Sequence, residues 1–332
     1  MDEIISLDYG SGGKKTARLI EKLILPRLDN PALRELGDGA IVDGGEKLVF
    51  STDSFVVSPL FFPGGDIGKL SVCGTVNDLS MCGAEPKYLS CSFIIEEGFP
   101  FSQLERIVAS MAAQCEKVGV QIVTGDTKVV EKGRGDGIYI NTAGIGVLRH
   151  PGLSPGNIRS GDKVLVSGFV GDHGTAVMLA RNQMMQGEIA SDCAALNGLT
   201  EAILTAAPGV RVLRDPTRGG VATTLNEFVE GTALGIELEE AWIPVRPQVQ
   251  AACDMLGLDP LYCANEGKLL AVAAPADADK VLAAMKNHEL GTDAAIVGEV
   301  TERYPGKLTL RTAFGGSRVL QKLSGAQLPR IC

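Results

Sequence analysis

The amino-acid sequence predicts a protein of two domains in which helices and strands are mixed. Its 332 residues are about twice the length of a common domain. Hydrophobic residues make up 45% of the chain and charged residues 21%, which is typical of a packed globular protein and excludes disorder over most of the length. A stretch rich in proline and glycine at 151–161 separates the two halves. We therefore expect domains at 1–150 and 151–314, followed by a tail at 315–332.

In the first half, alternation of apolar and polar residues predicts strands, and apolar residues three or four positions apart predict helices. We expect strands at 47–57, 87–95, 121–130 and 137–148, and helices at 14–25, 66–82 and 102–118. Glycine, with 41 residues, gathers with aspartate at the ends of these apolar segments. Such clusters are typical of tight turns that surround a site.

The second half shows the same mixture of patterns. We expect strands at 163–167, 236–238, 268–273, 294–301 and 307–312, and helices at 173–182, 195–206, 219–231, 246–256 and 277–288. From Ala313 the periodic pattern stops, and glycine, serine and proline become frequent. We interpret the end of the chain as a mobile arm.

Charge and hydropathy exclude two broad classes of function. The net charge of −9 is opposite in sign to the basic surface that nucleic-acid binding needs. No apolar run approaches the roughly 20 residues that span a bilayer, and the N-terminus lacks the basic and apolar regions of a signal peptide. We therefore expect a cytoplasmic protein without a membrane helix. The sequence contains no Cys-x-x-Cys and no His-Glu-x-x-His, which gives little support for a zinc or iron–sulfur site.

A glycine-rich segment near the N-terminus is the first candidate binding site. Gly10, Ser11, Gly12 and Gly13 are followed by two lysines and by a helical pattern. Backbone N–H groups at the start of a helix can hold phosphate oxygens. The spacing is not that of a Walker loop, and a flexible N-terminal lead-in would explain the same residues.

Four aspartates in the first half point to a metal-dependent nucleotide site. Asp53 and Asp126 interrupt or end strand patterns, Asp78 lies inside an apolar helical pattern, and Asp38 lies between two glycines. Any one of them alone is explained as a helix cap or a turn residue. Together they predict a carboxylate cluster, which Mg²⁺ bridging to a polyphosphate would neutralise. Lys128, on the same strand face as Asp126, either reaches a transferred phosphoryl group or is a solvated lysine.

The second half and the C-terminus contribute three further candidates. Glu266 precedes an apolar strand, where its carboxylate suits either a general base or a surface turn. We interpret His173, at the start of a predicted helix, as a histidine satisfied by local hydrogen bonds. Cys332, the last residue, is either a frayed end without a role or a reactive thiol on a mobile arm, accompanied by Pro329 and Arg330. Tethering would raise the effective concentration of that thiol at any site within reach of the arm.

These motifs resemble those of the HypE family, the carbamoyl dehydratases of [NiFe]-hydrogenase maturation. The matching segments run in order along the chain at 10–13, 50–54, 77–78, 124–130, 171–174, 218–220, 265–268 and 329–332. The last of them, Pro-Arg-Ile-Cys, is the most specific. The glycine and aspartate motifs are shared with aminoimidazole ribonucleotide synthetase, selenophosphate synthetase and thiamine-monophosphate kinase. Tyr9 stands where family members often have histidine, so we assign position 9 no role.

The resemblance implies an α+β fold of the aminoimidazole ribonucleotide synthetase (PurM) type. In that fold the N-terminal domains of two subunits pair their sheets in a homodimer and bind ATP with Mg²⁺. The resemblance further implies that a carbamoyltransferase, HypF, loads a carbamoyl group onto the C-terminal cysteine. ATP then drives dehydration to a thiocyanate, and the cyano group passes to iron on the HypC–HypD complex.

The resemblance also assigns roles to residues of this chain. Cys332 would be the carrier thiol, and Lys128 and Glu266 would assist the chemistry. The Mg²⁺–ATP ligands would be Asp53, Asp78 and Asp126. The other residues expected to contact the nucleotide are Gly10, Ser11, Gly12, Gly13, Asp38, Asn77 and Thr127.

Two alternatives remain open from the sequence. One is a small-molecule kinase or synthetase of the same fold, although residues 6–9 lack the reactive cysteine or selenocysteine that selenophosphate synthetases usually place near the glycine loop. The other is a non-catalytic carrier whose arm is modified entirely by partners. Such a carrier would not need the aspartates or Lys128, so binding of Mg-ATP distinguishes it from an enzyme.

Overall fold

The structure is a computed structural model that describes residues 4–10, 18–34, 43–182 and 189–323. The chain forms two compact units. The N-terminal unit comprises Met1–Phe61, Asp66–Leu79 and Ala84–Leu148, and the C-terminal unit comprises Phe62–Gly65, Ser80–Gly83 and Arg149–Cys332. Within the described residues, no helix combines the length and the apolar character needed to cross a membrane.

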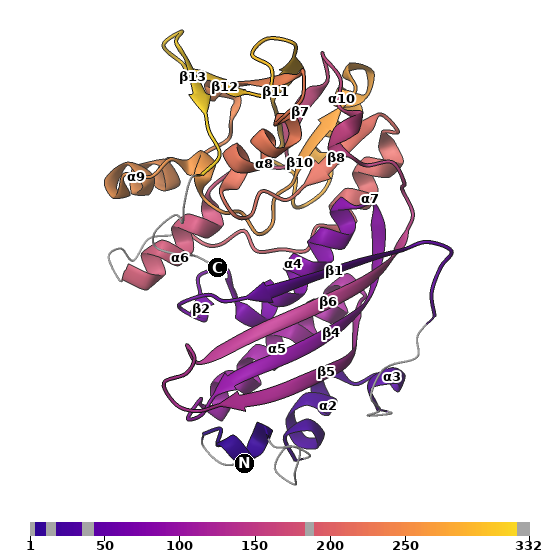
Figure 1. Cartoon of the computed structure of the whole chain (residues 1–332), viewed down its shortest axis with the longest axis vertical. Coiled ribbons are helices and arrows are strands. Elements are labelled where there is room, and N and C mark those ends of the chain that lie inside the picture. The colour runs from indigo at the N-terminus through magenta and orange to yellow at the C-terminus, as the bar shows by residue number, and fades with distance from the viewer. Residues whose placement is uncertain (1–3, 11–17, 35–42, 183–188, 324–332) are drawn as a thin grey trace. The chain divides into compact units, whose positions relative to one another are not determined.

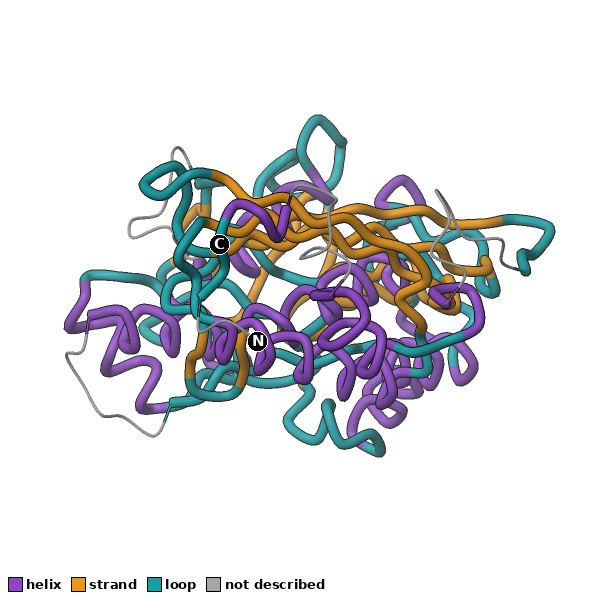
Figure 2. Tube along the Cα trace, turned by 90° about the horizontal axis from the view of Figure 1, so that it is seen from below, coloured by secondary structure: helices purple, strands orange, loops and turns teal. Residues whose placement is uncertain are grey.

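The N-terminal unit is a four-stranded sheet with helices on one face (Figures 1 and 2). The strand order is β1-β6-β4-β5, with β1 at Leu48–Phe55, β4 at Ala84–Glu96, β5 at Gln121–Val130 and β6 at Ile138–Leu148. The pairs β1–β6 and β6–β4 are antiparallel, whereas β4 and β5 are parallel. Parallel neighbours need a long crossover, and here α5 (Phe101–Val118) provides it. The other main helix of this unit is α4 (Ile67–Met81).

Alternation along β6 shows how this sheet carries its helices. Ile138, Ile140 and Thr142 are buried, and the residues between them are half-buried. The Thr142 hydroxyl donates a hydrogen bond to the carbonyl of Ser71 at 2.9 Å and lies 2.6 Å from the hydroxyl of Thr75, both in α4. The polar groups buried between helix and sheet are therefore hydrogen-bonded, which avoids the cost of burying them unpaired.

The C-terminal unit is built on a seven-stranded sheet in the order β13-β12-β9-β11-β7-β10-β8. Its strands are β7 (Lys163–Val166), β8 (Val210–Arg214), β9 (Gly235–Glu239), β10 (Leu270–Ala273), β11 (Ala295–Thr301), β12 (Leu308–Arg311) and β13 (Ser317–Leu320). Its helices are α6 (Asp172–Asn182), α7 (Asn197–Ala206), α8 (Gly220–Val229), α9 (Pro247–Leu256) and α10 (Pro275–Lys286).

Both faces of the C-terminal sheet are buried. In β7, Val164 and Val166 pack in one apolar cluster with Leu225 of α8. Leu165, between them, packs in a second cluster with Leu199 of α7. Because successive side chains of a strand point to opposite faces, a strand covered on both sides is apolar, as β10 and the last three residues of β7 are.

Most elements predicted from the sequence are present within a few residues of the expected bounds. The structure adds β8 and β13, the short strands β2 (Phe61–Phe62) and β3 (Gly65–Asp66), and the short helices α2 (Leu25–Leu28) and α3 (Pro31–Arg34). The residues at 18–24 continue the helix expected from 14, whose first part lies outside the described residues.

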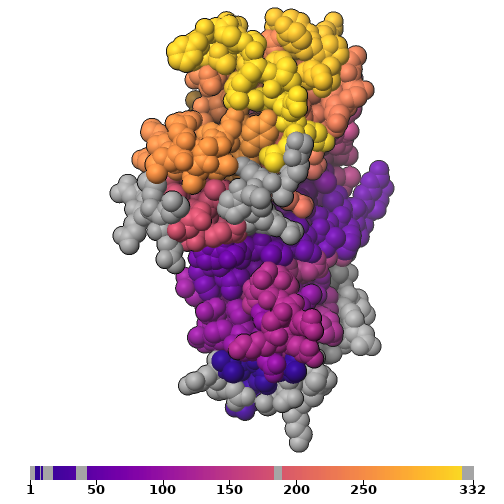
Figure 3. All heavy atoms as spheres, turned by 60° about the vertical axis from the view of Figure 1, so that its left-hand side comes forward, coloured from indigo at the N-terminus to yellow at the C-terminus, as the bar shows by residue number. Residues whose placement is uncertain are grey.

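The first residues of the tail expected at 315–332 form a strand. Strand β13 (Ser317–Leu320) pairs antiparallel with β12 and lies at the surface of the C-terminal unit (yellow in Figure 3). The turn between them closes because Gly315 adopts a φ of +84° and the Thr312 N–H donates to the carbonyl of Gly316 at 2.8 Å. The rest of the predicted arm, at 324–332, lies outside the described residues.

Close approach of α4 to the sheet depends on Gly144, and this contact can be tested. A Cβ at position 144 would lie 2.8 Å from Cγ2 of Thr75 and 2.9 Å from Cδ1 of Leu79, which is too close for carbon atoms. Gly144→Ala should therefore lower the free energy of unfolding by about 1–3 kcal/mol through overpacking. Equilibrium urea unfolding followed by circular dichroism measures the change.

Gly135→Ala, in the same unit, is the matched control, because a Cβ there would find its nearest neighbour at an ordinary 3.6 Å. Its unfolding free energy should stay within about 1 kcal/mol of the parent value. Equal stability of the two variants would contradict the role of Gly144.

Candidate functional site

Two of the predicted carboxylates lie together on the helix-covered side of the N-terminal sheet. Asp53 is half-buried in β1 and pairs across the strands with Thr142, which packs under α4. One of its carboxylate oxygens lies 3.7 Å from the position that a Cβ on Gly74 of α4 would occupy. Asp78, one helical turn after Gly74, accepts a hydrogen bond of 2.7 Å from the hydroxyl of Ser51 in β1. The register of β1 on α4 thus places Asp53 and Asp78 on the same side of the strand.

The third predicted carboxylate lies on the opposite, open face of the same sheet. Asp126 of β5 pairs with Ser92 of β4, which pairs with Asn141 of β6, which pairs with Ser54 of β1. Residues paired in this way share a face, and Ser54 faces away from its neighbour Asp53. Three strand spacings of roughly 4.8 Å also separate β5 from β1, or about 14 Å. A single copy of this unit therefore does not gather Asp53, Asp78 and Asp126 around one point.

Lys128 extends from the same open face and forms an ion pair with Asp126. The Lys128 ammonium lies 3.1 Å from one carboxylate oxygen of Asp126, and the two side chains are 64% and 59% exposed. The prediction that these residues share a strand face is therefore confirmed. The hydrogen bond from Lys128 lowers the pKa of Asp126 below its ordinary value, and a backbone hydrogen bond from Thr127 adds to this effect. Asp126 is thus ionised at neutral pH.

Mg²⁺ fits the pair Asp53 and Asp78 better than it fits all three carboxylates. Among the described residues, the structure contains no group of three or more His, Cys, Asp or Glu side chains placed to hold a metal. Mg²⁺ is commonly bound through one or two carboxylates, with phosphate oxygens and water completing its shell. Two half-buried carboxylates on one side of β1 meet that requirement when a polyphosphate supplies the other ligands.

The remaining predicted nucleotide contacts differ in how the structure places them. Asn77, in the middle of α4, is completely buried, so its side chain supports the helix packing rather than facing solvent. Thr127 donates its backbone N–H to Asp126 at 2.8 Å. Gly10 ends a short 3-10 helix at Leu7–Gly10. The predictions for Ser11, Gly12, Gly13, Asp38 and Cys332 concern positions outside the described residues.

Glu266, the predicted base, lies in the C-terminal unit on the loop before β10. The residue is 5% exposed. Its backbone N–H donates to a carboxylate oxygen of Asp192 at 3.1 Å, and its carbonyl accepts from the N–H of Ala194 at 3.1 Å. Asn265, beside it, accepts from the Gly171 N–H at 2.8 Å and donates to the carbonyl of Pro216 at 3.1 Å. The loop is therefore held to its neighbours on both sides.

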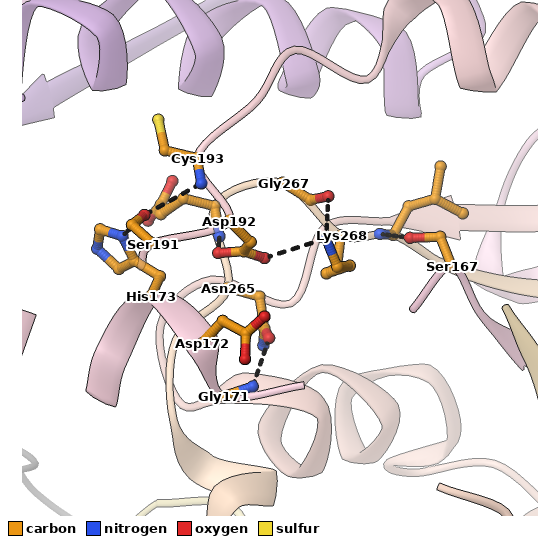
Figure 4. Close-up of polar contacts among 12 residues, drawn as sticks. Ser167, Gly171, Asp172, His173, Ser191, Asp192, Cys193, Asn265, Gly267 and Lys268 are labelled. Atoms are coloured by element: carbon orange, nitrogen blue, oxygen red, sulfur yellow. Dashed lines mark hydrogen bonds and ion pairs between the residues drawn. The ribbon is translucent and has the colours of Figure 1, made fainter. Parts of the chain in front are cut away.

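His173 is the second residue of α6 and is completely buried (Figure 4). Its Nδ1 lies 2.8 Å from the hydroxyl of Ser191, and its ring packs edge-on against Phe62. Burial lowers the pKa of His173 to about 4, so the ring is neutral at physiological pH. The interpretation of a satisfied histidine holds for Nδ1, whereas Nε2 has no hydrogen-bond partner among the described residues.

Sequence reasoning missed Asp192 and gave no role to Lys268. The side chain of Asp192 is 2% exposed, and its second carboxylate oxygen lies 3.8 Å from the ammonium of Lys268 (Figure 4). Its partner Glu266 is 74 residues away along the chain. No local pattern reveals such a contact, and the only sequence signal is a carboxylate between the apolar residues Ile189 and Cys193.

Comparison with known proteins extends the similarity over the whole chain. The family described as AIR synthase related protein matches with its N-terminal domain at residues 36–148 and with its C-terminal domain at 159–311. The chain is 54% identical to carbamoyl dehydratase HypE of Cupriavidus necator, over 99% of this chain and 95% of that protein. It is 47% identical to carbamoyl dehydratase HypE of Escherichia coli, over 99% of each.

Solved structures agree with these relatives. A crystal structure of hydrogenase maturation protein HypE in complex with ATP is 47% identical, with a TM-score of 0.95, and the match covers 98% of this chain and 99% of that one. A chain from a HypE–HypF complex is 48% identical, with a TM-score of 0.81 and coverage of 92% and 99%. Thiamine monophosphate kinase from Aquifex aeolicus, at 18% identity and a TM-score of 0.63, shares the fold alone.

The family and the α+β fold implied by the sequence motifs are thereby confirmed. Identity close to one half over nearly the full length leaves no domain of this chain unmatched. The chain belongs to the HypE family of carbamoyl dehydratases.

Proposed function

We propose that this chain is an ATP-dependent dehydratase that converts an S-carbamoyl group on Cys332 into a thiocyanate. The cyano group then serves as a ligand for the iron of [NiFe]-hydrogenase. The observation that carries the proposal is 54% identity to a carbamoyl dehydratase over 99% of the chain, which contains the Pro-Arg-Ile-Cys segment at 329–332. The 47% identity to a HypE crystallised with ATP supports the use of that nucleotide.

The chemistry explains the need for ATP. In Cys–S–C(=O)–NH₂ the carbonyl oxygen must leave, and hydroxide is a poor leaving group. Attack of that oxygen on the γ-phosphorus, with loss of one N–H proton, gives S–C(=NH)–O–PO₃²⁻ and ADP. Loss of the second N–H proton, with cleavage of the C–O bond, gives S–C≡N and phosphate. The carbonyl oxygen leaves in phosphate, and ATP is consumed.

Asp53 and Asp78 would hold the metal that accompanies the nucleotide. Their carboxylates lie on one side of β1, and both are hard oxygen ligands. When bound, Mg²⁺ would neutralise the polyphosphate and the charge that develops on the transferred phosphoryl group. Asp126 remains part of the proposed nucleotide site, at a position on the open face of the sheet.

Lys128 would offset negative charge during phosphoryl transfer. Its ammonium is exposed and at present paired with Asp126, which keeps it on the open face of the sheet. An exposed pair of this kind contributes little to stability, so the lysine can exchange partners when a phosphate approaches. A positive charge at that point favours the transition state more than the ground state, which is the condition for catalysis.

Glu266 would accept the nitrogen protons. The residue is nearly buried, and its backbone is held at both its N–H and its carbonyl. A base held in a site with little water also protects the cargo, because hydrolysis of the thiocarbamate would release it.

We further propose that the protein acts as a homodimer in the cytoplasm, with HypF as the carbamoyl donor and HypC–HypD as the cyanide acceptor. The open sheet face carries the exposed apolar residues Leu48, Phe50 and Ile94, and Phe50 is 68% exposed. Exposed apolar side chains on an uncovered sheet face favour packing against a second sheet. The same face carries Asp126 and Lys128, so a second copy there would complete the surroundings of these residues. The 48% identity to the HypE in a HypE–HypF complex supports the choice of donor.

Intact mass spectrometry tests the carrier role of Cys332. With the transferase, carbamoyl phosphate and ATP, the parent protein should gain about 43 Da and then shift to about 25 Da above its starting mass. Cys332→Ser should show neither addition, because it lacks the thiolate nucleophile, while ATP affinity stays within about twofold. Cys82→Ser, which alters an exposed cysteine, should behave as the parent. A gain of about 43 Da on Cys332→Ser would contradict the assignment of Cys332 as the carrier.

Titration calorimetry tests the nucleotide site. Asp53→Asn and Asp78→Asn should each weaken Mg-ATP binding by about tenfold or more, since each removes a charged metal ligand. Chelation of the metal should weaken binding by the parent in the same direction. Asp136→Asn, which alters an aspartate hydrogen-bonded to Tyr139 in the loop before β6, is the control and should bind normally. Unchanged affinity in both site variants would place the nucleotide elsewhere.

Sedimentation velocity tests the dimer. The parent protein should sediment as a dimer, with twice the chain mass of 34.8 kDa. Phe50→Arg should sediment as a monomer, because it introduces a charge into the proposed apolar interface. Met255→Arg, which alters a 70% exposed residue of α9, should remain dimeric. A dimer that persists in Phe50→Arg, with an unchanged circular dichroism spectrum, would exclude this face as the interface.

A further inference from the structure

The segment at 189–194 packs directly against the loop that carries Glu266. The backbones are so close that a Cβ on Gly267 would lie 1.8 Å from the carbonyl oxygen of Asp192. Any side chain at position 267 would therefore force the two segments apart. This contact brings the carboxylate of Asp192 to the backbone N–H of Glu266, although the two residues are 74 positions apart in the sequence.

Asp192 is a buried carboxylate with few partners. One of its oxygens accepts the Glu266 N–H at 3.1 Å. The other is buried and, within the described part of the chain, has no hydrogen-bond partner. The ammonium of Lys268 lies 3.8 Å from that oxygen, and the Lys268 side chain is 12% exposed. Because a buried carboxylate with an unsatisfied oxygen is costly, its presence at this position calls for an explanation beyond packing.

The segment that carries Asp192 is itself held rigidly. The hydroxyl of Ser191 accepts the N–H of Cys193 at 3.0 Å and lies 2.8 Å from Nδ1 of His173. The Ser191 N–H donates to the carbonyl of Pro63 at 2.8 Å. Figure 4 shows Ser191, His173 and Cys193 together on one side of Asp192, with Lys268 on the other. The carboxylate therefore projects from a fixed support toward the Glu266 loop.

We propose that Asp192 is a positioning residue that fixes the backbone of Glu266 for proton transfer, with Lys268 balancing the buried charge. The inference rests on the proposed function and deepens it. Hydrogen bonds hold the Glu266 N–H through Asp192 and the Glu266 carbonyl through Ala194, so both peptide groups around this residue are fixed.

A charged acceptor suits this task better than a neutral one. Hydrogen bonds from an N–H to a carboxylate are stronger and shorter than those to neutral oxygens. The Lys268 ammonium also donates to the carbonyl of Gly267 at 3.2 Å, so a single cation ties the carboxylate and the loop together. Displacement of a reacting group by about 1 Å can slow a reaction by about 100-fold, which sets the scale of the effect expected when this support is lost.

Two substitutions at Asp192 separate positioning from general stability. Asp192→Ala removes the acceptor, and the single-turnover rate of carbamoyl to cyano conversion, followed by intact mass, should fall by about 30- to 100-fold. Asp192→Asn keeps an oxygen that can accept the Glu266 N–H, and should recover the rate to within about fivefold of the parent. The Michaelis constant for ATP should change by less than about twofold in both, because the proposal gives Asp192 no contact with the nucleotide.

Asp162→Ala is the matched control. Asp162 is also a nearly buried carboxylate that accepts a backbone N–H, from Arg159 at 2.8 Å, and it pairs with Arg211 at 3.3 Å. Asp162 lies just before β7. Ser167, which accepts the N–H of Leu269 beside the Glu266 loop, lies just after β7, so the two residues are at opposite ends of the strand. Its loss should lower the melting temperature as much as Asp192→Ala does, yet leave the rate of conversion unchanged.

The outcomes distinguish the inference from the function beneath it. A rate within twofold of the parent in folded Asp192→Ala would overturn the inference. Equal losses in Asp192→Ala and Asp192→Asn, or an equal loss in Asp162→Ala, would overturn it as well. If the parent itself gives no conversion, the proposed function fails, and the inference fails with it. Conversion by the parent with undiminished conversion by Glu266→Gln would reject Glu266 as the base.

Discussion

Alternation of side chains along the strands of the N-terminal sheet decides on which face Asp53 and Asp126 lie. Asp53 of β1 shares its face with Thr142 and α4, whereas Asp126 of β5 shares the open face with Ser92 and Asn141. No rotation of side chains brings groups on opposite faces of one sheet together. A nucleotide site that uses both faces therefore needs something beyond one sheet. The proposed second copy on the apolar open face would surround Asp126 and Lys128, whereas Asp53 and Asp78 lie on the helix-covered side.

The C-terminal unit is distinguished by polar groups that are buried beside its sheet. Apolar clusters on both faces of the seven-stranded sheet hold β7 and β10 in place. The buried polar residues lie in segments outside these two strands. Asp172, Asp192 and His173 are all nearly buried, and each has one polar atom without a hydrogen-bond partner in the described part of the chain. Burial raises the pKa of Asp172 and lowers that of His173, so both effects favour the neutral forms. Such groups cost stability, and a rigid apolar scaffold is what allows them to persist.

The sequence predicted the elements well where the local signal was strong and poorly where it was weak. The bounds of β5 match the prediction, because six of its ten residues are β-branched and favour a strand. Strand β8 was missed because it is short and follows Pro208 and Gly209 closely. Strand β13 was missed because two of its four residues are polar, and only its pairing with β12 makes it a strand. The same distinction applies to the site. The shared face of Asp126 and Lys128 follows from a spacing of two residues, whereas the face that Asp53 occupies relative to Asp126 depends on strand order.

Residues that support a reacting group are harder to predict than the reacting group itself. Glu266 stands out locally, because a carboxylate before an apolar strand is unusual in the pattern. Asp192 contacts Glu266 across 74 residues of sequence through one backbone N–H, and this contact depends on Gly267 allowing two segments of the chain to touch. A glycine beside the candidate base is therefore as informative as the base, since it marks where another segment must approach. In this protein the approaching segment carries a hydrogen-bond acceptor, Asp192, and that acceptor gives the close contact a role beyond packing.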